Sequence, residues 1–118
     1  MIFVAKNEKD IPTWLLILDG DKTTTRRMKP MDVGKEFAVQ PGRGKFAVCR
    51  ARVINCMNSS DHYNKYDHIL ALYDSVDDYK ADEARLEGFG SWEELMLWFK
   101  DHKINFMDTF RIEFKVIK

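Results

Sequence analysis

Basic side chains that could bind phosphate are concentrated in the first half of the chain. Between residues 21 and 52, nine lysines and arginines stand against three acids, although the whole chain has 19 basic and 19 acidic residues and no net charge. Guanidinium groups form paired hydrogen bonds with phosphate oxygens, so this stretch is a candidate surface for nucleic acid. The alternative is a solvated surface that keeps the protein soluble. The candidate phosphate-binding residues are Arg26, Arg27, Arg43, Lys45, Arg50 and Arg52.

Lys22 is a separate candidate because of its local setting. It follows Gly20 at a turn between a predicted helix and a predicted strand, where a lysine can point into a cleft and meet a phosphate or a carboxylate. The alternative is an exposed lysine in contact with water, which is the commoner situation for this residue type. Lys22 is therefore a candidate by its position rather than by its type.

Five stretches have the composition or the alternation of β-strands. They are Ile2–Val4, Thr23–Thr25, Glu36–Gln40, Phe46–Ile54 and Phe110–Val116. The third and fourth flank the sequence Pro-Gly-Arg-Gly-Lys, whose glycines allow a tight reversal, so we expect a β-hairpin. Arg43 and Lys45 then lie at its tip, and Arg50 and Arg52 share one face of its second strand. In the last stretch, the residues between the apolar ones, Arg111 among them, are expected to face solvent.

Three helices are predicted from capping residues and apolar spacing. Asp10 is expected to cap the first helix, which carries Trp14 on its apolar stripe and stops at Gly20. Ser75 and Ser91 each precede an acid by three residues, which is a capping pattern. They predict helices that end near Gly88 and near His102. Tryptophans could stack on bases, but Trp14, Trp92 and Trp98 fall in these helices, where core packing is the commoner role.

The order of these elements predicts an α+β fold or a small barrel. Strands and helices do not alternate regularly, which argues against a parallel sheet. A chain of 118 residues has room for one hydrophobic core, so residues 1–118 are expected to form a single domain. The stretch from Asn58 to Asp74 has no clear pattern, although its Tyr63 and Tyr66 are further candidates for base stacking.

Several classes of site lack their signatures in this chain. There is no phosphate-binding Gly-rich loop, no dinucleotide fingerprint and no Gly-x-Ser-x-Gly nucleophile motif. His62 and His68 are six apart with no further ligand at a recognisable spacing, and Cys49 and Cys56 form no Cys-x-x-Cys pair, so we expect no metal and no cofactor. The amino terminus becomes charged after five residues, which predicts a cytoplasmic protein with no membrane partner.

Three motifs resemble those of the ASCH family, in the order that this family shows. The first is Gly20-Asp-Lys-Thr-Thr-Thr-Arg-Arg27, which matches every fixed position of the pattern Gly-x-Lys-Thr-x-Thr-x-Arg. The second is Phe37–Lys45, which is similar to the hairpin of the phage-type branch of the family. The third is Leu86-Glu-Gly-Phe89 followed by Ser91-Trp-Glu-Glu-Leu95. The resemblance covers the chain from about Thr13 to the carboxyl end.

The resemblance implies a PUA-like fold, which is a small β-barrel flanked by helices, in a cytoplasmic protein. It also implies candidate catalytic residues. Some ASCH members hydrolyse the acetyl amide of 4-acetylcytidine with a Lys, Thr and Glu trio, and the matching residues here are Lys22, Thr25 and Glu87. Thr25 would be the nucleophile, Lys22 its base or a support for the oxyanion, and Glu87 a proton shuttle or an orienting group. In a fully extended strand Thr25 would face away from Lys22, so the trio requires a bend near Thr23 or Thr24.

The resemblance leaves several functions open, because one fold carries many activities. The first is an RNA-binding or modified-nucleoside-binding protein that recognises its ligand through a basic cleft. The second is a hydrolase, either an amidohydrolase of the 4-acetylcytidine type or a small ribonuclease. A protein-binding adaptor is a further alternative. The sequence carries no signature of an oligomeric state.

Overall fold

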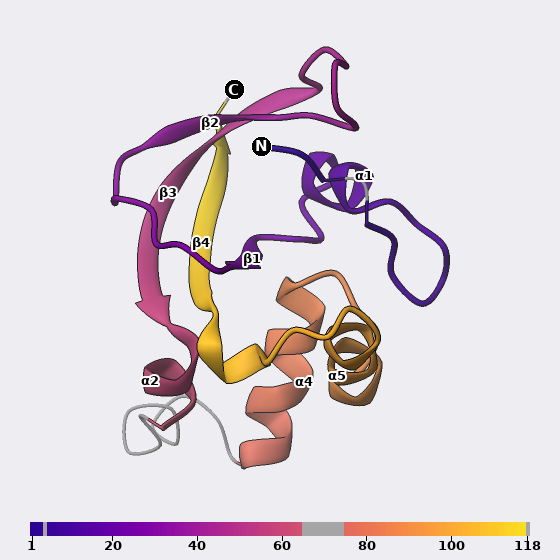
Figure 1. The fold of residues 1–118 in the computed structure, drawn as a ribbon, viewed down its shortest axis with the longest axis vertical. Coiled ribbons are helices and arrows are strands. Elements are labelled where there is room, and N and C mark those ends of the chain that lie inside the picture. The colour runs from indigo at the N-terminus through magenta and orange to yellow at the C-terminus, as the bar shows by residue number, and fades with distance from the viewer. Residues whose placement is uncertain (4, 65–74, 118) are drawn as a thin grey trace.

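The protein has a mixed α and β architecture built on one antiparallel sheet. The computed structural model describes residues 1–3, 5–64 and 75–117. The sheet has four strands in the order β1-β4-β3-β2 and curls like half a barrel, as Figure 1 shows. The strands are β1 (Thr24–Arg27), β2 (Glu36–Val39), β3 (Cys49–Asn58) and β4 (Phe110–Ile117). The coarse prediction of an α+β fold with flanking helices is thus confirmed, and the curled sheet is compatible with the small barrel that was expected.

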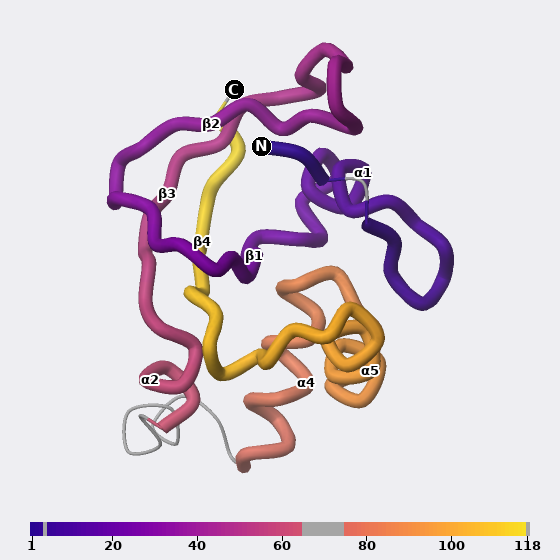
Figure 2. The backbone as a smooth tube through the Cα atoms, in the orientation of Figure 1, coloured from indigo at the N-terminus to yellow at the C-terminus, as the bar shows by residue number. Residues whose placement is uncertain are grey.

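Helices cover the sheet at two places. One helix, α1, lies near the amino terminus, and α4 and α5 lie together beside the end of the sheet where β1 meets β4, as the tube in Figure 2 shows. In the described part of the chain, the helices are α1 (Thr13–Leu18), α2 (Ser59–Asn64), α4 (Val76–Leu86) and α5 (Trp92–Asp101), with a short 3-10 turn η1 (Phe106–Asp108) before β4.

The apolar interior of the described residues consists of two clusters rather than the single core expected. The first joins the sheet to α1 and contains Phe3, Ile17, Phe37, Val39, Ala51, Val53, Ile112 and Phe114. The second joins α4, α5 and η1 and contains Ala84, Phe89, Leu95, Phe99 and Phe106. Strand β1 lies where they meet, because the guanidinium of Arg27 covers the ring of Phe3 and that of Arg26 covers the ring of Phe106.

Most of the predicted local elements are confirmed. Strands β2 and β3 pair as an antiparallel hairpin. The hydroxyls of Ser75 and Ser91 accept hydrogen bonds from the third residue beyond them and so cap α4 and α5. Gly20 and Gly88 follow α1 and α4 with positive φ angles of 83° and 94°, the backbone region that favours glycine after a helix.

Three details of the prediction are wrong. Asp10 does not cap α1, because it adopts a φ of 62° and the helix begins only after Pro12. The strand predicted at Thr23–Thr25 begins one residue later and continues to Arg27, so Arg26 and Arg27 belong to β1. Arg111 does not face solvent, because α4 covers its side of β4 and the side chain is buried. In place of the strand predicted at Ile2–Val4, Ile2 forms one isolated parallel bridge with Gln40. Val4 lies outside the described residues.

Gly88 provides a test of how tightly the end of α4 packs against α1. A Cβ atom there would lie 2.8 Å from Leu16 Cδ1 and would also require a positive φ. We expect Gly88→Ala to lower the free energy of unfolding by about 2–4 kcal/mol through strain and overpacking. Gly44→Ala is the matched control, because its φ is also positive but no atom lies within 4 Å, so about 1–2 kcal/mol is expected. Equal losses in urea unfolding would contradict this account.

Candidate functional site

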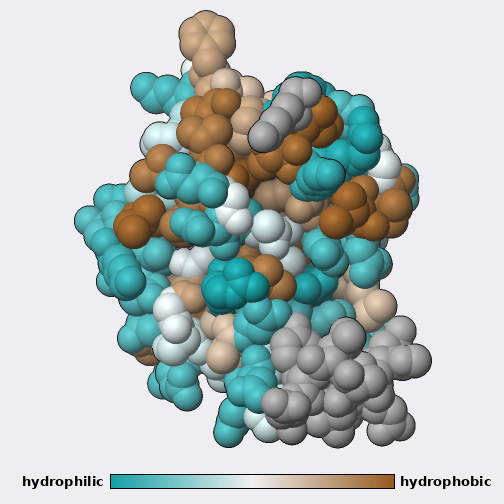
Figure 3. Space-filling view, turned by 180° about the vertical axis from the view of Figure 1, so that it is seen from behind, coloured by the Kyte–Doolittle hydropathy of each residue, from teal (hydrophilic) through white to brown (hydrophobic). Residues whose placement is uncertain are grey.

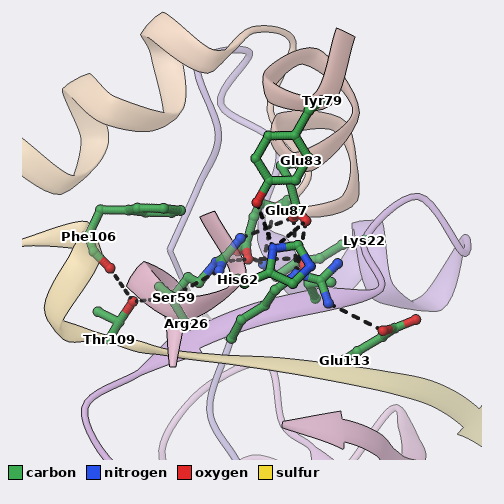
Figure 4. Close-up of polar contacts among 12 residues, drawn as sticks. Lys22, Arg26, Ser59, His62, Tyr79, Glu83, Glu87, Phe106, Thr109 and Glu113 are labelled. Carbon is green, nitrogen blue, oxygen red and sulfur yellow. Dashed lines mark hydrogen bonds and ion pairs between the residues drawn. The ribbon is translucent and has the colours of Figure 1, made fainter. Parts of the chain in front are cut away.

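The carboxylate of Glu87, at the C-cap of α4, receives three side-chain donors from β1 and the turn before it. Lys22 Nζ lies 3.1 Å from one oxygen, and Thr24 Oγ1 and Arg26 Nε each lie 2.8 Å from the other. Lys22 Nζ also donates to the backbone carbonyl of Glu87 at 3.0 Å. The amide of Thr23 donates to Leu86 at the end of α4, which holds the two segments side by side. Figure 4 shows these groups converging from both segments.

A second buried carboxylate, Glu83, lies one helical turn before Glu87. Its oxygens accept hydrogen bonds from Arg26 Nη2 at 3.0 Å and from Arg111 Nε at 3.0 Å. Arg26 therefore joins the two carboxylates, and its remaining nitrogen donates to the Ser59 hydroxyl at 3.0 Å. Residues four apart in a helix share one face, which explains why one guanidinium can reach both acids. His62 lies at the edge of this network, with Nδ1 at 3.4 Å from Glu83.

Burial and the neighbouring charges set the protonation of the two central groups. Burial lowers the pKa of Lys22 below its ordinary value, and the attraction of Glu87 opposes this only in part. Burial alone would raise the pKa of Glu87, but the charges of Lys22 and Arg26 and the Thr24 hydrogen bond outweigh it and lower the pKa to about 2. Glu87 is thus ionised at neutral pH, and burial makes Lys22 easier to deprotonate than a lysine in water.

A cavity of about 230 Å³ opens beside this network, where the two apolar clusters meet. One part of its wall is polar and comes from the residues before and within β1 and from α4. The other part is mainly aromatic and comes from the amino-terminal segment and from the region of α5. The polar wall contains Lys22, Thr25, Arg26, Arg27 and Glu87. The apolar wall includes Ile2, Phe3, Phe89, Leu95, Trp98 and Phe99.

The three residues assigned by the family resemblance, Lys22, Thr25 and Glu87, line this one cavity. The bend that the trio was expected to require is not seen, because the alternate residues Lys22, Thr24 and Arg26 all donate to Glu87, as on one face of an extended segment. Lys22 and Thr25 nevertheless both line the cavity. Thr24, rather than Thr25, donates to Glu87. Thr25 is buried, and its hydroxyl makes no hydrogen bond to any residue that the structure describes.

The six predicted phosphate-binding residues occupy three different environments. Arg27 lines the cavity, and its Nε is buried without a hydrogen-bond partner among the described residues. Arg26 also lines the cavity, but it is buried and three of its five N–H groups are bonded to Glu87, Glu83 and Ser59. The other four lie on the outside of the hairpin. Arg43 and Lys45 are exposed at its tip, and Arg50 and Arg52 lie on its second strand within 3.9 and 3.3 Å of Glu36.

The aromatic candidates are also divided. Trp98 lines the cavity and stacks on His102, with ring centroids 3.9 Å apart. Tyr63 packs against Tyr79 and Trp92 instead. Tyr66 and His68 lie outside the described residues. Among the residues that are described, no three His, Cys, Asp or Glu side chains gather closely enough to hold a metal ion, and no helix is long and apolar enough to cross a membrane.

Sequence reasoning missed four members of the network, namely Thr24, Ser59, Glu83 and Arg111. Glu83 had one usable signal, because it lies four residues before the candidate Glu87 and so on the same face of the predicted helix. Arg111 had none, since its position in an alternating strand indicates solvent. Comparisons of the chain with family models, with curated proteins and with solved structures find no match.

The low pKa of Glu87 makes stability depend on pH in the acid range. Because the pKa of about 2 in the folded protein lies below the ordinary 4.5, the ionised group stabilises the fold fully above about pH 5, and this contribution disappears as pH falls towards 2. We expect Glu87→Gln to lower the free energy of unfolding by about 3 kcal/mol at pH 6 and by much less at pH 2.5. The exposed Glu93→Gln is the control for a generic loss of charge. A deficit that is the same at both pH values would contradict the pairing.

Proposed function

We propose that the cavity binds a modified pyrimidine nucleoside of the 4-acetylcytidine type and hydrolyses its acetyl amide. The observation that carries the proposal is the single cavity lined by Lys22, Thr25 and Glu87 on one side and by aromatic rings on the other. The resemblance of three sequence motifs to the ASCH family supports the same reading. An ASCH-type, PUA-like domain is accordingly the family assignment that we propose.

The size and lining of the cavity favour a small planar ligand. Pockets for drug-sized molecules usually measure about 300–1,000 Å³, so a cavity of about 230 Å³ suits one base with part of its sugar. A planar base can lie against Trp98 or Phe99, since aromatic faces stack on bases without selecting their sequence. The polar wall would then face the exocyclic group of the base. In the proposed binding mode, an N4-acyl group lies next to Thr25 and Lys22.

The proposed reaction uses Lys22 as the base in its neutral form. A neutral amine has two protons and one lone pair, and the carbonyl and the carboxylate of Glu87 accept both protons. The lone pair is then left for the hydroxyl proton of Thr25. The Thr25 oxygen attacks the acetyl carbon, and Lys22 passes the proton to the departing N4 amine. Water then hydrolyses the acetyl-threonine ester, so the products are cytidine and acetate.

Two further side chains support this chemistry. The unpartnered Arg27 Nε can donate a hydrogen bond to the oxyanion that forms at the acetyl carbon. Arg26 supplies the charge that balances Glu87, as Arg111 does for Glu83. When Lys22 loses its proton, the hydrogen bonds from Arg26 Nε and Thr24 Oγ1 to Glu87 remain, so the carboxylate is not left unpaired.

The hydroxyl of Thr25 can be removed with little change of shape. We expect Thr25→Val to reduce kcat for 4-acetylcytidine by at least about a thousandfold, as removal of a nucleophile does, while Thr25→Ser retains measurable turnover. Thr23→Val is the matched control, because Thr23 lies before β1 and does not line the cavity. Lys22→Met should also be inactive. Acetate release is followed by mass spectrometry, with a mixed RNA pool beside it to detect strand cleavage. Turnover that persists in Thr25→Val would refute the proposed nucleophile.

The charge-balancing role of Arg26 predicts a specific change in the pH profile. Without Arg26, Lys22 must keep its proton to balance Glu87, so the pKa of Lys22 rises. We expect Arg26→Gln to move the acid limb of the profile of kcat/KM against pH upward by more than one pH unit. Arg26→Lys keeps the positive charge, so its acid limb should lie closer to that of the original protein than the acid limb of Arg26→Gln does.

The control for this prediction is Arg85→Gln, which removes a surface pair with Asp82. Arg26→Gln is also expected to destabilise the fold by about 3–5 kcal/mol, so the profile is recorded where circular dichroism shows the variant folded. A uniformly lower rate with an unchanged profile would mean that Arg26 acts on structure alone.

A further inference from the structure

The tip of the β2–β3 hairpin exposes an aromatic ring between basic residues. Phe46 is 96% exposed, the largest value among the large apolar side chains that the structure describes. Arg43 and Lys45 precede it and are also exposed. The hairpin lies at the top of the molecule in Figure 1. In the view from behind in Figure 3, one side chain projects from the surface at that end. A single exposed ring is normal on a protein surface, so the inference rests on the combination of this ring with the basic residues beside it.

The backbone around this tip is held by hydrogen bonds, so the exposure of Phe46 belongs to an ordered turn. The amide of Lys45 donates to Gly42 at 3.2 Å, and the side chain of Gln40 donates to the carbonyl of Lys45 at 3.3 Å. Beyond the tip, the amide of Val48 donates to Val39 at 2.8 Å and closes the hairpin. The backbone that carries the ring is therefore already ordered, so binding a ligand there costs less conformational entropy of the chain.

The charge at the tip is uncompensated. From Phe37 to Ser60 the chain contains no acidic residue. Arg50 and Arg52, lower on the hairpin, lie beside Glu36, but Arg43 and Lys45 make no ion pair with any residue that the structure describes. A ligand for this surface must therefore combine a flat apolar face with negative charge.

We propose that the hairpin tip binds single-stranded nucleic acid, with one unpaired base stacked on Phe46 and the adjacent phosphates bound by Arg43 and Lys45. Base stacking on one aromatic ring contributes about 1–3 kcal/mol, and each neutralised phosphate adds an affinity that depends on salt. A duplex does not suit the tip, because its bases are already stacked. An anionic membrane is also a poorer partner, since two cations contribute only about 1 kcal/mol each and one ring buries little apolar surface.

The hairpin adjoins the cavity described above. Gln40, at the base of the turn, exchanges backbone hydrogen bonds with Met1 and Phe3, and Ile2 and Phe3 line the cavity. A strand bound at the tip can thus continue towards the cavity. The inference extends the proposed function, because the substrate would be a modified nucleotide within a strand. Its binding step is nevertheless independent of the reaction.

The experiment uses the whole protein and a fluorescent single-stranded RNA of twelve nucleotides, with the same sequence as DNA and as an RNA duplex. Polarisation gives the affinity at several salt concentrations. We expect Phe46→Leu to weaken binding of both single strands about tenfold, because leucine is apolar but has no ring face, and Phe46→Trp to bind at least as tightly as the original. The duplex should bind weakly and respond to neither change. Replacing Arg43 and Lys45 with Gln should reduce the slope of log affinity against log salt by about 1.4.

The control is Leu97→Ala, which removes an exposed apolar side chain from α5 and should change nothing. Equal binding by Phe46→Leu and the original protein would overturn the inference. So would retention on phosphatidylserine vesicles that is lost in Phe46→Ala, because it would identify a membrane partner. Turnover of free 4-acetylcytidine is measured in the same variants and should be unchanged. If the original protein lacks that turnover but Phe46→Leu still loses affinity for the strands, the proposed reaction fails and the strand-binding site stands.

Discussion

The guanidinium of Arg26 connects three elements of the fold through bonds to two buried carboxylates and a serine. It donates to Glu87 at 2.8 Å, to Glu83 at 3.0 Å and to Ser59 at 3.0 Å, and so ties β1 to α4 and to the start of α2. Buried charges are tolerated only when they are paired and hydrogen-bonded, since each alone would cost several kcal/mol. The position of α4 relative to the sheet is therefore fixed by complementary charge as much as by apolar packing.

This polar layer also explains why the interior is divided. Apolar side chains cannot pack continuously through a layer of five ionisable groups, so they gather on both sides of it. Phe3 and Phe106 mark the two boundaries, because each ring lies beneath an arginine of β1. Where the two clusters separate, a cavity with one polar wall and one aromatic wall results. The feature that organises the fold thus also provides a place where a ligand can bind.

The sequence predicts well what depends on neighbours along the chain. The serine caps of α4 and α5, the β2–β3 hairpin and the glycine at the end of α1 were all expected, because capping and turn chemistry act over a few residues. What depends on which segments meet was missed. Arg111 has the alternation of an exposed residue, yet it is buried because α4 brings Glu83 over its face of β4. No local pattern contains that pairing, because the two residues are 28 apart.

The two adjacent threonines show how finely the strand register sets the site. Successive side chains of a strand point to opposite faces, so Thr24 donates to Glu87 while Thr25 lines the cavity. Pairing of Thr25 with Ile112 and of Arg26 with Arg111 fixes this register against β4. A shift by one residue would exchange the faces, direct the hydroxyl of Thr25 to the carboxylate and remove Arg26 from both acids. The charge network and the open hydroxyl therefore require the same register. The buried carboxylates stabilise that register, because a shift by one residue would take Arg26 away from both of them.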